Sequence, residues 1–108
     1  MTQYVGFLRG APSRELSPAE AQHTLERYLA WNAALTPAPG GGGLSRKGRV
    51  LGLTATDGPY AEGAEVVGGF ITIEAGSLEE ASKLFSDHPH LEFGTIEVRK
   101  IGEQGCED

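Results

Sequence analysis

Two helix-start signals, each lying between strand-like apolar runs, constrain the fold of this chain most strongly. Ser17 is a suitable N-cap, Pro18 fits the first helical position, and Glu20 completes a capping box. Ser77 and Glu80 repeat the capping box before a second apolar helical stretch. Because strand-like runs precede and follow each helix, the predicted order is strand, helix, strand, and then the same again.

The spacing of apolar side chains places the predicted elements along the chain. Strands are expected where β-branched and aromatic residues gather, over residues 4–9, 49–54, 66–74 and 94–101. The first helix is expected to carry one apolar stripe, formed by Ala21, Leu25, Tyr28, Trp31 and Leu35. Prolines in residues 36–39 end this helix, and the glycine run 40–43 is predicted to be a flexible loop. Strong turn residues follow at 56–60.

This order of elements predicts the fold class. Two right-handed crossovers give an α+β fold of the ferredoxin-like βαββαβ type, with a four-stranded antiparallel sheet and both helices on one face. A chain of 108 residues, 39% of them apolar, has room for one compact domain. We expect that domain to span residues 1–101 and residues 102–108 to form an acidic C-terminal tail.

The strand predicted at residues 66–74 is apolar on both sides. A strand with one exposed face normally alternates apolar with polar residues. Here one side carries Val67, Gly69, Ile71 and Ile73, and the other carries Val66, Gly68, Phe70 and Thr72. We therefore expect the sheet face without helices to pack against a second copy of the chain in a homodimer.

Composition excludes several classes of function. The net charge of −6 leaves no basic stripe for phosphates, so we expect no nucleic-acid partner. No apolar run is long enough to span a membrane, and the N-terminus lacks a signal-peptide pattern. The single Cys106 excludes an internal disulfide framework. A cytoplasmic location is expected.

Residues 57–62 read Asp-Gly-Pro-Tyr-Ala-Glu, and residues 65–70 read Glu-Val-Val-Gly-Gly-Phe. This pair of segments resembles the signature of the DGPF proteins within the YCII-related family, to which the YciI-like proteins also belong. The likeness extends to residues 43–48, 77–81 and 94–99, and so covers most of the chain from Trp31 onward. The resemblance implies a dimeric α+β barrel and no single settled activity. A related branch includes an enzyme that dechlorinates a hydroxyquinol ring.

The same resemblance implies a possible acid–base pair, a His and an Asp from the region of the first helix. His23 is the match for the histidine, whereas the acid would fall near Asn32. The Thr-Lys that usually follows the motif is replaced by Gly63 and Ala64, which removes a cation. His88 stands before Pro89 where Cys is common in the family.

The motif also supplies candidate chemistry of its own. The Asp57 carboxylate can act as a base or bind a ligand, although fixing the turn by hydrogen bonds to the backbone is the favoured interpretation. Glu62 and Glu65 lie close to Asp57 in sequence, and crowded carboxylates raise one another's pKa. Tyr60 suits a pocket or a subunit interface. Asp57, Glu62 and His23 are thus the catalytic candidates.

The remaining candidates would bind a ligand. Glu97 and Arg99 share one face of the last predicted strand, where they can pair or hold a polar ligand. Trp31, Tyr60 and Glu65 complete the predicted ligand-binding set. His88 and His90 lack the third and fourth ligands of a zinc site, so no metal is expected. The glycine run does not end in the Gly-Lys-Ser/Thr of a phosphate loop, and no cofactor is expected.

These observations leave alternative functions open. The favoured one is a dimeric small-molecule-binding or regulatory module, since no catalytic constellation is recognisable. The alternative is a small cofactor-independent enzyme that uses acid–base chemistry in the barrel cleft, similar to a lyase or dehydrochlorinase. A purely structural interaction partner is a third possibility.

Overall fold

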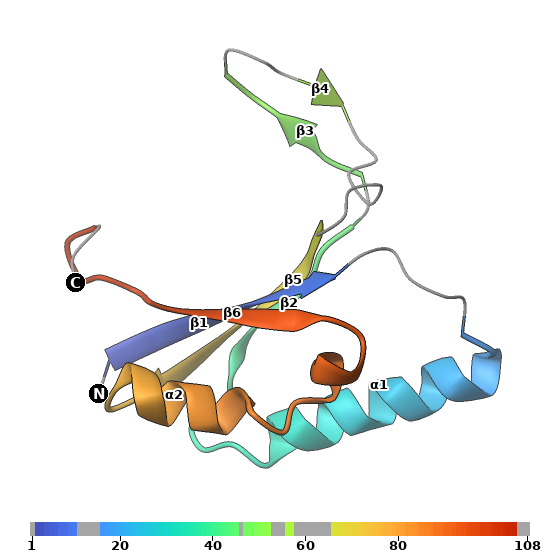
Figure 1. Cartoon of the computed structure of the whole chain (residues 1–108), viewed down its shortest axis with the longest axis horizontal. Helices are drawn as coiled ribbons and strands as arrows, with labels where there is room; N and C mark the ends of the chain where they lie inside the picture. The colour runs from blue at the N-terminus through green and yellow to red at the C-terminus, as the bar shows by residue number, and fades with distance from the viewer. Residues whose placement is uncertain (1, 11–15, 46, 53–55, 58–65, 106–108) are drawn as a thin grey trace.

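The computed structural model describes residues 2–10, 16–45, 47–52, 56–57 and 66–105, with only the backbone of residues 50, 56 and 57. The fold is α+β (Figure 1). Four strands form one sheet in the order β2-β5-β1-β6, and every neighbouring pair is antiparallel. Their bounds are Thr2–Gly10 for β1, Gly40–Gly43 for β2, Val66–Ala75 for β5 and Thr95–Lys100 for β6.

The helices α1 (Pro18–Ala33) and α2 (Leu78–Phe85) lie on the same side of this sheet (Figure 1). The strand order and the placement of the helices are those of the ferredoxin-like arrangement, so the predicted fold class is confirmed at this level. The dimeric barrel stays a prediction.

Both helices begin where the sequence predicts. In α1 the Ser17 hydroxyl accepts a hydrogen bond from the Glu20 amide, and the Glu20 carboxylate accepts one from the Ser17 amide, each at 3.1 Å. In α2 the Ser77 hydroxyl accepts from the Glu80 amide in the same way, but the Glu80 carboxylate accepts from the amide of Gly76 instead. These bonds satisfy backbone donors that have no partner inside a helix.

The prediction for the second strand is wrong. The glycine run that we expected to be a loop is strand β2, which pairs with β5 from Gly40 opposite Thr72 to Gly43 opposite Gly69. Of the expected strand at residues 49–54, the described residues form only β3 (Arg49–Val50), which pairs with β4 (Thr56–Asp57) in a separate two-stranded sheet. Figure 1 shows this small hairpin standing away from the four-stranded sheet. Glycine carries no side chain, so a glycine strand has no alternating pattern to recognise.

The core lies between the sheet and the helices. Tyr4 and Ile73 face each other across β1 and β5, and both are 5% exposed. Phe85 from α2 and Trp31 from α1 close this core with stacked rings 5.5 Å apart. Partly buried residues complete it: Leu35, Ile71, Leu84, Ile96 and Val98.

The two helices meet the sheet differently. α2 packs directly on β1, β5 and β6, and Phe85 occupies the space above Gly6, where an added Cβ would lie 2.7 Å from the Phe85 ring. α1 instead packs against η1 (Pro89–Glu92), a short 3-10 helix that follows α2. The half of the sheet beneath α1 is therefore less tightly covered than the half beneath α2.

Candidate functional site

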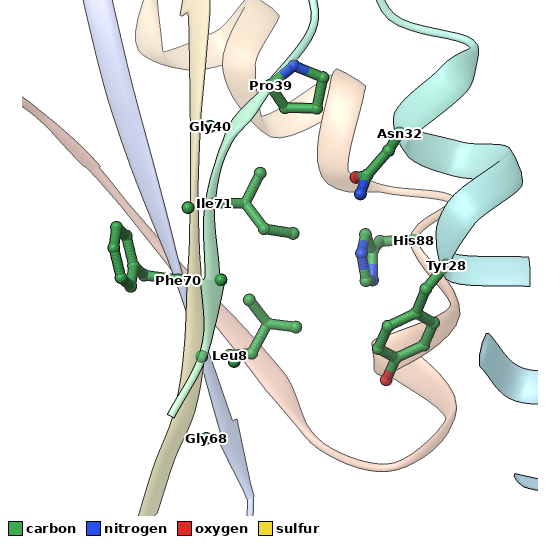
Figure 2. Close-up of a pocket in the computed structure, with 13 residues that line it drawn as sticks. Leu8, Tyr28, Asn32, Pro39, Gly40, Gly68, Phe70, Ile71 and His88 are labelled. Atoms are coloured by element: carbon green, nitrogen blue, oxygen red, sulfur yellow. The ribbon is translucent and has the colours of Figure 1, made fainter. Parts of the chain in front are cut away.

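A cavity of about 220 Å³ lies between α1 and the β2–β5 side of the sheet. In Figure 2, Leu8 and Ile71 point into this space from the sheet, Tyr28 and Asn32 approach from α1, and the His88 ring lies between the two groups. Phe70 contributes its backbone, since its ring points away on the other face of the sheet (Figure 2). The rest of the described lining is formed by Pro39, Gly40, Gly41, Gly42, Gly43, Gly68 and Gly69.

Glycines in β2 and β5 create this cavity. Residues opposite each other in antiparallel strands share a face of the sheet, so Gly43 and Gly69 face α1 as Ile71 does. Neither carries a side chain that would fill the space beneath the helix. A Cβ on Gly43 would approach nothing more closely than the Gly68 carbonyl oxygen, at 4.0 Å. The space is thus open at Gly43, and a side chain there would enter the cavity.

His88 supplies the imidazole of the cavity. It precedes η1, and its Nδ1 accepts a hydrogen bond of 3.0 Å from the His90 amide. Its ring meets Tyr28 and Trp31 edge to face, with centroids 5.0 and 4.7 Å apart. The residue is only 3% exposed. Burial is the main cause that lowers the pKa of His88 to about 4, and the charge of His90 acts in the same direction, whereas the charge of Asp87 opposes it. The ring is therefore neutral at pH 7.

Tyr28 and Asn32 bring two further neutral polar groups to the cavity. They are four residues apart in α1 and so lie on one face of the helix. Burial raises the pKa of the Tyr28 hydroxyl, which keeps the phenol protonated at neutral pH. Among the described residues that line the cavity there is no Asp, Glu, Lys or Arg. The site is therefore apolar with a few uncharged hydrogen-bonding groups.

A comparison with known protein families shows the family of this chain. The YCII-related domain matches residues 3–104. The chain belongs to this family. It matches no curated protein closely enough to count as a relative. None of the described helices is both long and apolar enough to cross a membrane.

The YCII-related signature itself lies largely outside the described residues. Tyr60, Glu62 and Glu65 fall there entirely, and only the backbone of Asp57 is described, in β4. The candidate acid–base chemistry of this segment stays a prediction.

The other candidates are not gathered at one site. His23 is exposed on α1. Trp31 is 8% exposed and belongs to the core, where its indole N–H donates to the Asp87 carboxylate at 3.0 Å. Glu97 pairs with Arg9 of the neighbouring β1 at 2.9 Å, and Arg99 is exposed on β6. None of the predicted residues with described side chains, namely His23, Trp31, Glu97 and Arg99, belongs to the described lining of the cavity.

Sequence reasoning missed the three polar residues of the cavity as a group. The sequence places Tyr28 in the apolar stripe of the helix, and the family resemblance marks Asn32 only as the place where an acid is expected. The His88 ring holds the turn before η1 by accepting from the His90 amide, and the His90 ring joins η1 to β1 by donating from Nε2 to the Arg9 carbonyl at 2.9 Å. The one signal was His88 itself, which replaces the Cys common in the YCII-related family.

A metal centre has no support in this part of the structure. The described residues include no group of three or more His, Cys, Asp or Glu side chains that would hold an ion.

Proposed function

We propose that this YCII-related protein is a homodimeric, cytoplasmic small-molecule-binding or regulatory module. The ligand would occupy the cavity between α1 and the β2–β5 side of the sheet. One observation carries the proposal: a cavity of about 220 Å³ is kept open by glycines and is lined by neutral polar groups on an apolar wall. Ligand sites in proteins typically combine an apolar lining with a few placed polar groups.

The chemistry of the cavity favours binding over acid–base catalysis. A general base works best when its pKa lies near the working pH. His88, with a pKa of about 4, is a weak base at pH 7. The enzyme alternative depends instead on Asp57 and Glu62, whose side chains lie outside the described residues. Turnover that is lost in Asp57→Asn, with folding intact, would favour that alternative.

The open face of the sheet supports the dimer. Phe7 and Phe70 lie opposite each other in β1 and β5, and Phe70 is 36% exposed on the face away from the helices (Figure 2). An aromatic pair of this kind, with Phe70 exposed and Phe7 half-buried, suits a surface that packs against another protein surface. A second copy of the chain fits this role because it presents the same apolar face, as twofold dimers require.

The binding proposal can be tested by closing the cavity from β2. Gly43→Val places a branched side chain in the open space that faces α1. Gly42 lines the cavity with its backbone alone, and Gly42→Ala adds a methyl group on the opposite face, where an added Cβ meets nothing within 4 Å. We expect uncharged fragments detected by saturation-transfer NMR to bind the unmodified chain and Gly42→Ala but not Gly43→Val. Equal binding to both variants would place the ligand elsewhere and refute the proposal.

A further inference from the structure

The geometry of the cavity also indicates what kind of molecule it holds. We infer that its ligand is a compact, uncharged molecule that presents an acceptor oxygen, and that the His88 Nε2–H group donates the hydrogen bond to that oxygen. This inference rests on the proposed binding function and adds to it the chemical class of the ligand and the residue that selects it.

The size of the cavity limits the ligand. An engineered protein cavity of roughly 150 Å³ binds benzene, and pockets for drug-sized ligands begin at about 300 Å³. The cavity beneath α1, at about 220 Å³, lies between these two. It therefore suits a molecule of the size of a benzene ring with one small substituent.

The described lining of the cavity favours an uncharged ligand over an ionic one. Its described lining contains no charged side chain to pair with one. The nearby Arg27 is already bonded to Glu92, and Arg9 to Glu97, through their guanidinium groups. Removing an ion from water without a compensating charge is costly. An uncharged ligand avoids that cost.

The hydrogen bonds of His88 determine which ring nitrogen carries the proton. Nδ1 accepts from the His90 amide, so it must present a lone pair. A neutral imidazole has one N–H, and in this ring it is consequently on Nε2. The orientation of a histidine donor is commonly set in this way by the bond that the other nitrogen makes.

The Nε2–H group is a donor without a protein acceptor. His88 makes no hydrogen bond besides the one at Nδ1 among the described residues. Every described side-chain nitrogen or oxygen that is fully buried has a hydrogen-bond partner. Because Nε2 has no partner in the described part of the chain, it is not fully buried. Since His88 is 3% exposed and lines the cavity, we assign the opening at Nε2 to the cavity side. An oxygen atom of a ligand would complete the bonding of the ring.

Three probes of similar size separate the contributions. Acetophenone carries an acceptor oxygen, ethylbenzene has a similar shape without one, and benzoate carries the acceptor with a negative charge. Dissociation constants at pH 7 would be measured by NMR titration. We expect acetophenone to bind roughly 3- to 10-fold more tightly than ethylbenzene, as one net hydrogen bond provides, and benzoate to bind most weakly.

Two variants of His88 assign the effect to the right nitrogen. His88→Asn keeps an acceptor near the position of Nδ1, and hence the cap on η1, but its amide donor ends short of the position of Nε2. His88→Gln reaches the position of Nε2 with an amide donor. We expect the preference for acetophenone over ethylbenzene to disappear in His88→Asn and to persist in His88→Gln. The ring ¹⁵N shifts of the unmodified chain should show a proton on Nε2.

The outcomes separate the two levels of the proposal. Equal binding of acetophenone and ethylbenzene, tightest binding of benzoate, or an unchanged preference in His88→Asn would overturn the inference about His88. The binding function would stand in each case if other fragments still bind the unmodified chain and fail to bind the Gly43→Val variant. If no fragment binds the unmodified chain, both fail together.

Discussion

His88 couples the stability of the fold to pH. Burial is the main cause that lowers its pKa from the ordinary 6.5 to about 4 in the folded chain. In the unfolded chain the ring returns to water and its ordinary pKa. Between pH 6.5 and 4 the unfolded chain therefore binds more protons at this residue than the folded chain does. Stability must rise with pH across this window.

We expect His88 to remove up to about 3 kcal/mol from the free energy of unfolding as the pH falls from 7 to 4. Urea denaturation at several pH values would measure the slope, which should become shallower in His88→Asn. His23→Asn removes an imidazole from an exposed position on α1 and serves as the matched control. An unchanged slope in His88→Asn would contradict the assignment of this pH dependence to His88.

Gly41 is the residue of β2 at which a side chain is least tolerated. Its φ is +109°, and an added Cβ would lie 2.0 Å from the carbonyl oxygen of Phe70 in β5. Gly41→Ala is expected to cost about 2 kcal/mol or more, from the strained backbone and the displaced strand. Gly42→Ala, with open space around its Cβ, is expected to change stability by less than about 1 kcal/mol. Thermal or urea unfolding of the two variants tests this difference, and similar losses in both would refute it.

The candidate site shows why single residues are hard to interpret without the fold. Tyr28, Asn32 and His88 each have an ordinary local role, in a helix stripe, on a helix surface and before a short helix. Their meeting depends on how α1 packs against η1, which no local pattern contains. The emptiness of the cavity depends in turn on glycines that local rules assign to a loop.

At the level of secondary structure, side-chain chemistry decides what could be predicted. α1 and α2 begin at their predicted caps, and β1, β5 and β6 match their predicted strands to within two residues at either end. These elements carry side chains whose apolar spacing distinguishes a helix from a strand and shows which face is buried. β2 consists of glycines and is held by backbone pairing with β5, so no side-chain pattern marks it as a strand. The sequence instead predicts the second strand at residues 49–54, where β-branched residues are present.

The two ends of α1 are attached unequally. Trp31, near the C-terminal end, stacks on Phe85 and donates to Asp87. Near the N-terminal end, Ala21 is exposed and the Leu25 side chain is 51% exposed. Helical hydrogen bonds that lack tertiary packing open more often than packed ones.

Amide hydrogen exchange should follow this inequality along α1. We expect the amides of residues 22–26 to exchange faster than those of residues 30–33, measured by NMR at a single pH. Trp31→Leu should raise the exchange rates of residues 30–33 toward those of residues 22–26, because it removes both the ring stacking and the indole donor. Uniform protection along the helix would show that the N-terminal half is held by packing on another surface.

For the molecule as a whole, the open face of the sheet determines the predicted assembly. Light scattering at micromolar concentration should give a mass of twice 11.4 kDa. Phe70→Glu puts a charge into the proposed interface and should yield the monomer. Leu29→Glu, at a residue 57% exposed on α1, should leave the mass unchanged. A monomeric unmodified chain would exclude the homodimer.

The strand order of the sheet has a consequence for synthesis on the ribosome. β1 lies between β5 and β6, with Val5 opposite Thr72 on one side and Arg99 on the other. β1 leaves the ribosome before both of its partners, which follow it in the chain by more than 50 residues. The central strand must therefore wait without hydrogen-bonded neighbours until β5 and β6 emerge, and such long-range pairing is slow to form. During that interval the aromatic strand β1 is exposed to chaperones and to other nascent chains.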